Sequence, residues 1–329
     1  MKVAVIGAGL AGLTAARILD GQNCEVVVLD KGRGAGGRMS TRRDGELRFD
    51  HGAQYFTVRD PRFMRDVFTW RDRGIVQAWQ ARIAVIGDGP AEALDSQQER
   101  FVALPGMSAV CSEIAGALPD CRFGWEARSA RFEDGLWRVE STAGEQVQAD
   151  AVLLAVPPEQ ARALCPGSAL EAGLAGVRML PCWAVMALFD QSLSTAWDAA
   201  FVNQGPLSWV ASQAAKPGRP AAHAWVLHAN PAWSLRHLED EPQAVAERLL
   251  QAVVELHGAE AVRAKKSVAH RWRYAVAERP LEKGALFDSA TRLAATGDWC
   301  HGSRVEGAFL GGVAAAGRMI ASVQPGYER

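Results

Sequence analysis

Two short apolar runs frame the N-terminal part of the chain. Residues 2–6 (KVAVI) are apolar and rich in β-branched side chains, the pattern of a buried parallel strand, and residues 24–29 repeat it. Between them, residues 10–20 carry apolar side chains at helical spacing. The pattern therefore predicts a strand, a helix and a second strand in that order.

Extended and helical patterns alternate over the next hundred or so residues. In chain order they predict a strand at 46–49, a helix at 61–73, paired strands within 75–86, a helix at 105–118, an antiparallel meander at 122–149 and a buried strand at 151–156. The turn Asp134-Gly135 lies inside the expected meander, where it favours a hairpin.

From residue 159 the pattern becomes typical of an antiparallel sheet with helices. After two short helices, we expect strands at 181–189, 207–213, 223–230 and 267–276, and an amphipathic helix at 242–257. A last strand at 293–296 leads into a long helix of small residues from Gly307 to about residue 323. The chain thus ends as it begins, with a strand that enters a helix through glycine.

Glycines occupy the turn between the first strand and the first helix. Gly7, Gly9 and Gly12 spell G-x-G-x-x-G, and the second strand ends on Asp30. Gly7 permits a tight turn, Gly9 lets a pyrophosphate approach the backbone, and Gly12 lets the helix pack on the strand. The helix N-terminus attracts phosphates, and Asp30 suits a ribose with a free 2′-OH. This order predicts a dinucleotide site, the alternative being a glycine turn that binds nothing.

Two further segments have the composition of cofactor contacts. Gly32, Gly34 and Gly37 repeat the glycine spacing without a strand before them, so we expect a loop laid along the same cofactor, with Arg38 on a phosphate. A flexible surface loop is the alternative. Residues 50–56 (DHGAQYF) place small residues before aromatic ones, which suggests a backbone pressed against a flat ring or, alternatively, a turn that enters the core.

Composition and charge exclude several classes of function. The 329 residues suggest about two domains, and the 36 basic and 37 acidic residues leave a net charge of −1, which gives no case for nucleic acid or a membrane surface as partner. No apolar stretch is long enough for a membrane span, and a strand at residue 2 leaves no room for a cleavable leader. The six scattered cysteines fit a reducing cytoplasm and predict neither disulfides nor a metal site.

Tryptophan is concentrated in the segments expected to form the antiparallel sheet. Eight of the eleven tryptophans lie within residues 61–100 and 159–285. This enrichment favours a pocket for flat aromatic ligands, and core filling is the alternative. On the predicted strand 223–230, His228 shares a face with Val226, opposite Trp225. On the predicted strand 267–276, His270, Trp272 and Tyr274 share one face, and Arg271 and Arg273 share the other.

In combination these motifs resemble the FAD-dependent amine oxidase superfamily and, within it, closely resemble the bacterial renalases. The superfamily resemblance is carried by Gly7–Gly12 with Asp30, by Gly36-Gly37-Arg38, and by Gly297-Asp298 with Val305–Ala308. The renalase resemblance is carried by Asp30-Lys31-Gly32-Arg33-Gly34, Gly52-Ala53-Gln54-Tyr55-Phe56, His270-Arg271-Trp272 and Gly297-Asp298-Trp299-Cys300. It covers essentially the whole chain.

The resemblance implies an α/β protein of two discontinuous domains. Residues 1–60, 101–158 and 286–329 would form a Rossmann-type FAD-binding domain, and residues 61–100 and 159–285 an α+β substrate domain on an antiparallel sheet. The residues expected to contact FAD are Gly7, Gly9, Ala11, Gly12, Asp30, Lys31, Gly37, Arg38, Met39, Gln54, Tyr55, Phe56, Arg128, Asp298, Val305, Glu306 and Gly307.

The roles implied for these residues follow the length of the cofactor. Asp30 would hold the adenosine ribose, Arg38 the pyrophosphate, and Asp298 the ribityl or phosphate region. The backbone near Arg128 would meet the adenine, and the amides of Val305–Gly307 the flavin pyrimidine ring, where they would stabilise negative charge. Cys300 lies too close to the last motif to be the cysteine that carries FAD in some relatives, so we expect non-covalent FAD.

Renalases are held to oxidise the 2- and 6-dihydro isomers of NAD(P)H, giving NAD(P)+ and passing electrons to oxygen as hydrogen peroxide. Arg304 departs from the amine oxidase pattern, because many amine oxidases place a tyrosine of an aromatic cage there. The residues expected at the substrate are His228, Arg271, Arg304 and Tyr55, with a structural role for each as the alternative. An amine oxidase for small amines and a non-catalytic relative similar to GDP-dissociation inhibitors are the competing functions.

Overall fold

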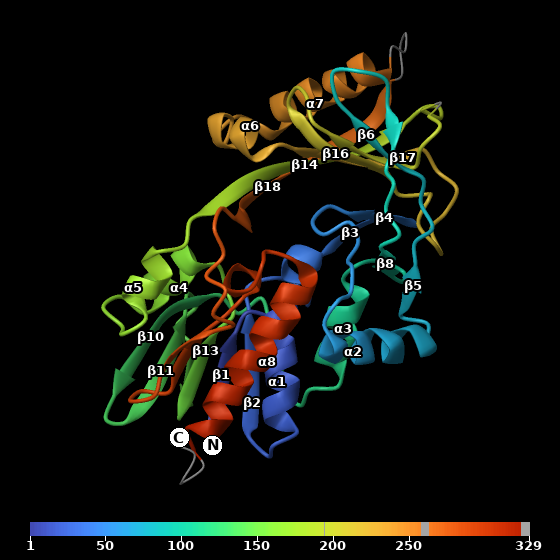
Figure 1. The fold of residues 1–329 in the computed structure, drawn as a ribbon. Helices are drawn as coiled ribbons and strands as arrows, with labels where there is room; N and C mark the ends of the chain where they lie inside the picture. Colours follow the sequence, from blue (N-terminus) through green and yellow to red (C-terminus); the bar gives the residue numbers. More distant parts are fainter. Residues whose placement is uncertain (194, 258–262, 324–329) are drawn as a thin grey trace.

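The protein is built on two sheets, stacked one above the other in Figure 1. The computed structural model describes residues 1–193, 195–257 and 263–323. Residues 194, 258–262 and 324–329, which the expected domains include, lie outside the described part. The α/β class predicted from the sequence is confirmed.

The first sheet has six strands in the order β19-β20-β13-β1-β2-β9, all parallel except β19. Their bounds are Leu286–Asp288, Leu293–Ala295, Ala151–Leu154, Lys2–Ile6, Glu25–Asp30 and Cys121–Phe123.

Both faces of this sheet are covered, which explains its continuous apolar runs. Val3 and Val5 pack with the helices, whereas Ala4 and Ile6 pack under the meander. The helices α1 and α8 lie on one side and the meander on the other, as Figure 1 shows. The bounds are Leu10–Asp20 for α1, Val305–Ala321 for α8, Ala109–Gly116 for α3, and Ala127–Glu133, Leu136–Ser141 and Gln146–Ala149 for β10, β11 and β12.

The second sheet has seven strands in the order β18-β14-β17-β16-β15-β6-β7, in which only β15 and β6 pair in parallel. Their bounds are Ala264–Ala277, Met179–Phe189, Ala224–Ala229, Leu207–Ser212, Ala199–Val202, Ile83–Ile86 and Glu92–Ala93.

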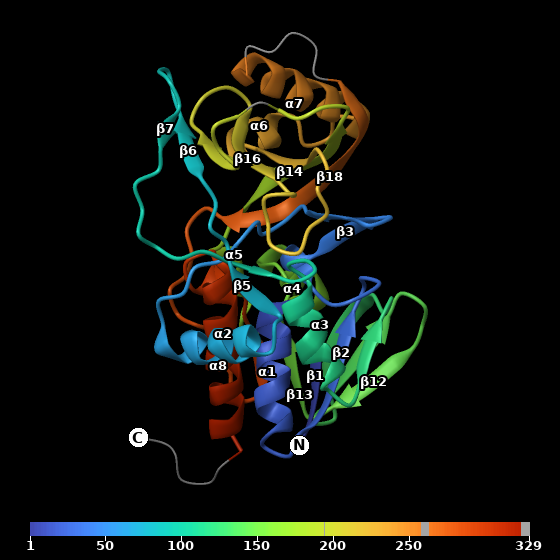
Figure 2. The same cartoon turned by 90° about the vertical axis from the view of Figure 1, so that its right-hand side faces the viewer.

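One face of the second sheet carries α6 (Pro231–Arg236) and α7 (Pro242–His257), which lie above it in Figure 2. Trp183, Trp225 and Leu249 are among the buried residues between this face and the helices. The other face looks toward the first sheet and receives the hairpin β3 (Thr41–Asp44) and β4 (Leu47–Asp50), where Phe49 packs on Met186.

Most predicted elements are present, and three of the strand assignments are corrected. The strands within 75–86 do not pair with each other: β5 (Val76–Ala78) pairs with β8 (Phe101–Ala103), and β6 joins the second sheet. The first strand of the expected meander is two strands, β9 and β10, because the amides of Gly124 and Trp125 bind the carbonyls of Gly32 and Asp30. The strand at 46–49 is the second arm of the β3–β4 hairpin.

The remaining helices are short or agree with the pattern. The helix expected from Pro105 begins only at Ala109. The bounds of the others are Pro61–Asp72 for α2, Pro158–Leu164 for α4 and Glu171–Ala175 for α5.

Candidate cofactor and substrate site

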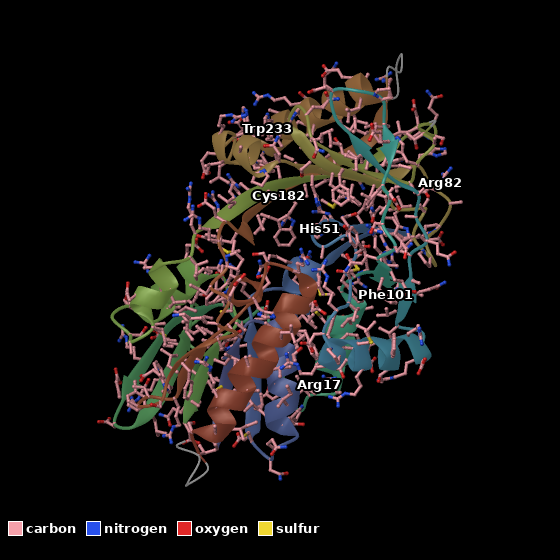
Figure 3. All side chains as sticks on the ribbon, in the orientation of Figure 1. Arg17, His51, Arg82, Phe101, Cys182 and Trp233 are labelled. Carbon is pink, nitrogen blue, oxygen red and sulfur yellow. The ribbon has the colours of Figure 1, made fainter. Side chains whose placement is uncertain are left out.

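A large cavity lies between the two sheets. Its volume is about 2410 Å³, and residues of both sheets line it. In Figure 3, His51, which follows β4, and Cys182 on β14 both lie in this region. Ordinary ligand pockets measure roughly 300–1,000 Å³, so this one has room for a dinucleotide and a second molecule.

The glycine turn forms one wall of the cavity. Gly7 has a φ of 112° and donates its amide to Leu29 O at 2.8 Å, a conformation that a side chain would strain. Helix α1 then begins beside the cavity without an acidic residue in its first turn, so its positive end faces the cavity uncompensated. Gly9 and Ala11 border the cavity, whereas Gly12 packs against Gly7 and Ala155 and does not.

The carboxylate of Asp30 is fixed in place by two backbone amides. Ala8 N donates to Oδ2 and Gly32 N donates to Oδ1, both at 2.6 Å. A carboxylate has about four acceptor positions, so Asp30 keeps free lone pairs toward the cavity that it borders. Lys31 and Arg128 lie further along the same wall, where they are largely exposed and face Glu126 and Glu140.

Arg38 and Asp298 form a bidentate ion pair at the wall of the cavity. The guanidinium donates to Asp298 at 2.6 and 3.0 Å and to Ala275 O at 3.1 Å. The predicted pyrophosphate residue and the predicted ribityl residue, 260 positions apart, are thus in contact. These bonds leave donors of Arg38 free, Nε among them, for an anion.

The last motif presents the start of α8 to the cavity. Val305 and Ala308 border the cavity at the N-terminal turn. The side chain of Glu306 is turned to the loop before α2, where it accepts the amides of Arg59 at 2.7 Å and Asp60 at 2.8 Å. Gly307 packs against the carbonyl of His301 and does not border the cavity.

Residues 50–56 combine backbone facing the cavity with side chains facing the core. Gln54 is 6% exposed, and its side chain binds Lys216, Gln213 and the carbonyl of Asp50. Phe56 is buried and bridges to Phe101. Gln54 and Phe56 still border the cavity, as does the buried Met39.

Tyr55 lies in an aromatic group at the cavity wall. Its ring centroid is 5.9 Å from that of Trp79 and 5.6 Å from that of Trp209, and the Arg100 guanidinium lies 5.5 Å above the ring. Phe201 packs on Trp209 at 4.6 Å. The tryptophans of this group fill space around Tyr55, which supports part of the core-filling interpretation.

A cluster of three histidines and a tryptophan covers the cavity face of the second sheet. His228 Nε2 lies 3.1 Å from His51 O, and Trp272 Nε1 donates to the same oxygen at 2.9 Å. The rings of His51 and Trp272 are stacked at 5.2 Å, and His270 meets Trp272 at 4.3 Å. Strand alternation indicated that His270 and Trp272 share a face, but no sequence pattern marked His51, which the β3–β4 hairpin brings there.

Burial keeps these imidazoles neutral. Desolvation, with a contribution from Lys216, lowers the pKa of His228 to about 4. Desolvation and the neighbouring His270 lower the pKa of His51 to about 4, and burial lowers the pKa of His270 as well. The histidine cluster is therefore uncharged at neutral pH.

The guanidinium of Arg271 has its Nη1 held on the helical side of the second sheet, and its other two nitrogens have no hydrogen-bond partner among the described residues. It donates to Leu238 O at 2.6 Å and to Glu239 at 2.7 Å, and it lies 5.5 Å above the ring of Trp183, which packs toward α6 and α7. Arg273 pairs with the same carboxylate. Alternation assigned both arginines to one face, and that face is the helical one, although both residues reach the cavity rim.

Arg304 lies at the cavity rim as the N-cap of α8. It is exposed, and no acceptor for its guanidinium is present among the described residues. Over residues 1–193, 195–257 and 263–323 the structure contains no group of His, Cys, Asp and Glu arranged to hold a metal ion. In that same part of the chain, every helix is too short or too polar to cross a bilayer.

The fold and the cavity define a class, the α/β oxidoreductases with a Rossmann-like nucleotide site. Residues 5–69 match the NAD(P)-binding Rossmann-like domain, and residues 88–320 match the family of flavin containing amine oxidoreductases. The chain belongs to the flavin containing amine oxidoreductase family, whose members use a flavin, typically FAD.

Solved structures of the same fold include a putative protoporphyrinogen oxidase from Exiguobacterium sp. 255-15, with a TM-score of 0.78, 13% identity and 98% of each chain covered. Cyclohexylamine oxidase from Brevibacterium oxydans IH-35A has a TM-score of 0.76 at 14% identity and covers 97% of this chain and 98% of its own. At such identities the likeness is one of fold. A 4,4'-diapophytoene desaturase of Staphylococcus aureus is 42% identical over 69 residues, which span 21% of this chain and only 13% of the desaturase.

The residues of the cavity fit FAD. The open space above Gly9, the free end of α1, the remaining lone pairs of Asp30 and the spare donors of Arg38 follow one another along a single wall. The N-terminal turn of α8 and the histidine cluster border the same cavity. This succession of amides, carboxylate and guanidinium matches the chemistry of a ribose, a pyrophosphate and an anionic ring edge.

Proposed function

We propose that this protein is an oxidase of isomeric dihydronicotinamides, which converts the 2- and 6-dihydro forms of NAD(P) to NAD(P)+ and reduces oxygen to hydrogen peroxide. The observation that carries the proposal is the uncharged wall of His51, His228, His270 and Trp272 opposite the cofactor wall. When bound, FAD supplies the hydride acceptor and the route for electrons to oxygen.

The cofactor would be held without a covalent link. Asp30 would bind the adenosine ribose, Arg38 with the end of α1 the pyrophosphate, and the start of α8 the pyrimidine edge. Cys300 is fully buried away from the cavity, and burial raises its pKa to about 12. Cys182, the cysteine that does border the cavity, also has its pKa raised to about 12 by burial, so neither thiol is a ready nucleophile.

The histidine–tryptophan wall suits a dihydropyridine ring. The flat rings of Trp272 and His51 form a stacked surface on which a ring can be oriented and from which water is excluded. Loss of hydride turns the substrate into an aromatic cation, and a neutral wall does not repel it. No residue of the wall is required to take a proton, which agrees with imidazoles whose pKa values lie well below 7.

The positive charge of Arg304 at the cavity rim favours a dinucleotide over an amine as the substrate. A fixed cation disfavours an incoming alkylammonium and favours molecules that carry phosphates. The competing function, oxidation of small amines, has the family itself in its favour, since cyclohexylamine oxidase shares the fold.

Selectivity of the Arg304→Leu variant separates the two functions. If the substrate is a dihydronicotinamide dinucleotide, Arg304→Leu raises its KM with little change in the rate of flavin reduction. The matched control is Arg65→Leu, which removes an exposed arginine of α2 that does not border the cavity. The proposal would be contradicted if Arg304→Leu changed neither the KM for dihydronicotinamides nor the rate of flavin reduction, and the wild type oxidised amines readily.

A further inference from the structure

The hydrogen bond of His228, a residue that borders the cavity, fixes which of its two ring nitrogens is an acceptor. Nε2 lies 3.1 Å from a backbone carbonyl, that of His51, so Nε2 carries the proton and donates. The ring is neutral at pH 7, since burial lowers its pKa to about 4. Nδ1 is therefore an unprotonated nitrogen with a lone pair.

This lone pair has no protein partner within the described part of the chain. His228 borders the cavity, half-buried at the end of β17, and its only hydrogen bond there is the one through Nε2. His51 presents a similar nitrogen, because Nδ1 points to Phe49 O at 3.4 Å and Nε2 has no partner. The two nitrogens thus offer acceptors to a ligand, whereas the donors Trp272 Nε1 and His228 Nε2 are both occupied by His51 O.

We propose that His228 Nδ1 selects substrates that carry a primary carboxamide on the ring, by accepting its N–H, and rejects the corresponding ring carboxylates. This inference rests on the proposed function and specifies the group that the site recognises. A carboxamide supplies two donors to a wall of acceptors, whereas a carboxylate supplies none and leaves two acceptors facing each other. A carboxylate therefore loses the hydrogen bond and is also repelled by the acceptor nitrogen.

Nearby cations compete with this effect. Arg42 lies close enough to influence His51 and His270 and would attract a carboxylate. Arg42 is exposed and lines the cavity from β3, so solvent screens its charge, whereas the His228 acceptor is held in place by its bond to the His51 backbone.

The test compares an amide with its acid on the FAD-loaded protein. Oxidised nicotinamide adenine dinucleotide and its nicotinic acid analogue are titrated separately, and binding is followed by perturbation of the flavin spectrum. We expect the amide to bind roughly 10- to 100-fold more tightly, the range expected for a lost hydrogen bond that leaves unpaired groups.

Two variants assign the preference to His228. His228→Phe keeps a flat ring but removes the acceptor, and His51 O keeps its bond from Trp272 Nε1, so the wall stays in place. We expect the amide preference to fall to within about threefold. The control His223→Phe changes an exposed histidine just before the same strand, outside the cavity, and keeps the full preference.

Failure of the inference and failure of the proposed function give different results. Flavin reduction by the dihydro forms of the amide and of the acid is measured alongside binding. The inference is overturned if the wild type binds acid and amide equally, or if the preference for the amide survives in His228→Phe. In either case, flavin reduction by dihydronicotinamides still supports the proposed function. If neither dihydro compound reduces the flavin, both are wrong.

Discussion

Asp50, the last residue of β4, links the β3–β4 hairpin to Lys216 and Arg219. Its replacement tests how strongly this buried ion cluster stabilises the fold. Its side chain is 0% exposed and accepts four hydrogen bonds, from Lys216 Nζ at 2.9 Å, Arg219 Nη2 at 2.6 Å, Thr41 Oγ1 at 2.7 Å and the amide of Met107 at 3.0 Å. Burial alone would raise the pKa of Asp50, but the two cations, together with the hydrogen bonds from Met107 and Thr41, hold that pKa below its ordinary value.

Removal of the carboxylate and removal of one cation leave different groups of this ion cluster unpaired. Asp50→Asn leaves Lys216 and Arg219, 0% and 1% exposed, buried without a carboxylate, and breaking such a pair costs about 3–5 kcal/mol. Lys216→Met leaves the carboxylate with Arg219, Thr41 and Met107, so the main loss is the charged hydrogen bond to Asp50, about 1.5–3 kcal/mol, because the Gln54 oxygen that Lys216 also binds keeps its bond from Gln213. A total stability of about 5–15 kcal/mol makes both losses measurable.

Urea unfolding of the FAD-loaded protein measures these losses through the transition midpoint at constant slope. The matched control is Asp44→Asn in the same hairpin, whose pair with Lys266 is 38% and 55% exposed and is worth about 0–1 kcal/mol. The expected order of destabilisation is Asp50→Asn, then Lys216→Met, then Asp44→Asn. Equal losses for Asp50→Asn and Lys216→Met would refute the argument that unpaired buried cations set the cost.

Three further predictions concern the cofactor wall and the histidines. Asp30→Ala weakens FAD binding by about 1–3 kcal/mol, measured by fluorescence titration, and an unchanged affinity would show that Asp30 does not meet the ribose. Gly52→Ala places a Cβ onto a backbone carbonyl and lowers stability by about 1–3 kcal/mol, whereas Gly87→Ala, which meets open space, does not, and similar melting temperatures for the two would contradict this packing. His51 and His228 have pKa values of about 4 in the fold against 6.5 when unfolded, so the unfolded chain takes up protons first and stability falls as the pH drops from 6.5 toward 4; a urea midpoint constant over that range would count against their burial.

The strand–helix–strand unit of β1, α1 and β2 could be predicted because its determinants are local. Residues 2–6 are apolar on both faces, as a covered parallel strand requires, and the glycine turn with Asp30 has few alternative structures. The pairing of β6 with β15 could not be predicted, because the two strands lie more than a hundred residues apart in the chain. A local hydrophobic pattern predicts a strand but does not identify its partner.

The candidate site was predictable in its cofactor half and less so in its substrate half. Alternation on β18 separated His270 from Arg271 correctly, but it does not say which face meets the cavity, and Arg271 lies on the helical face with Glu239. His51 reaches the wall through the β3–β4 hairpin, and Gln54 turns to Lys216. These placements depend on tertiary contacts that no periodicity in the sequence encodes.

Anaerobic reduction of the flavin tests the central claim most directly. The purified FAD-loaded protein is mixed without oxygen with the 2-, 6- and 4-dihydro forms of NAD and NADP and, separately, with monoamines, polyamines and cyclohexylamine, while the absorbance of oxidised flavin is followed. We expect rapid loss of this absorbance with a 2- or 6-dihydro form, slow loss with the 4-dihydro form, and slower loss still with every amine. Faster reduction by an amine than by any dihydronicotinamide isomer would contradict the account and assign the protein to the amine oxidases of its family.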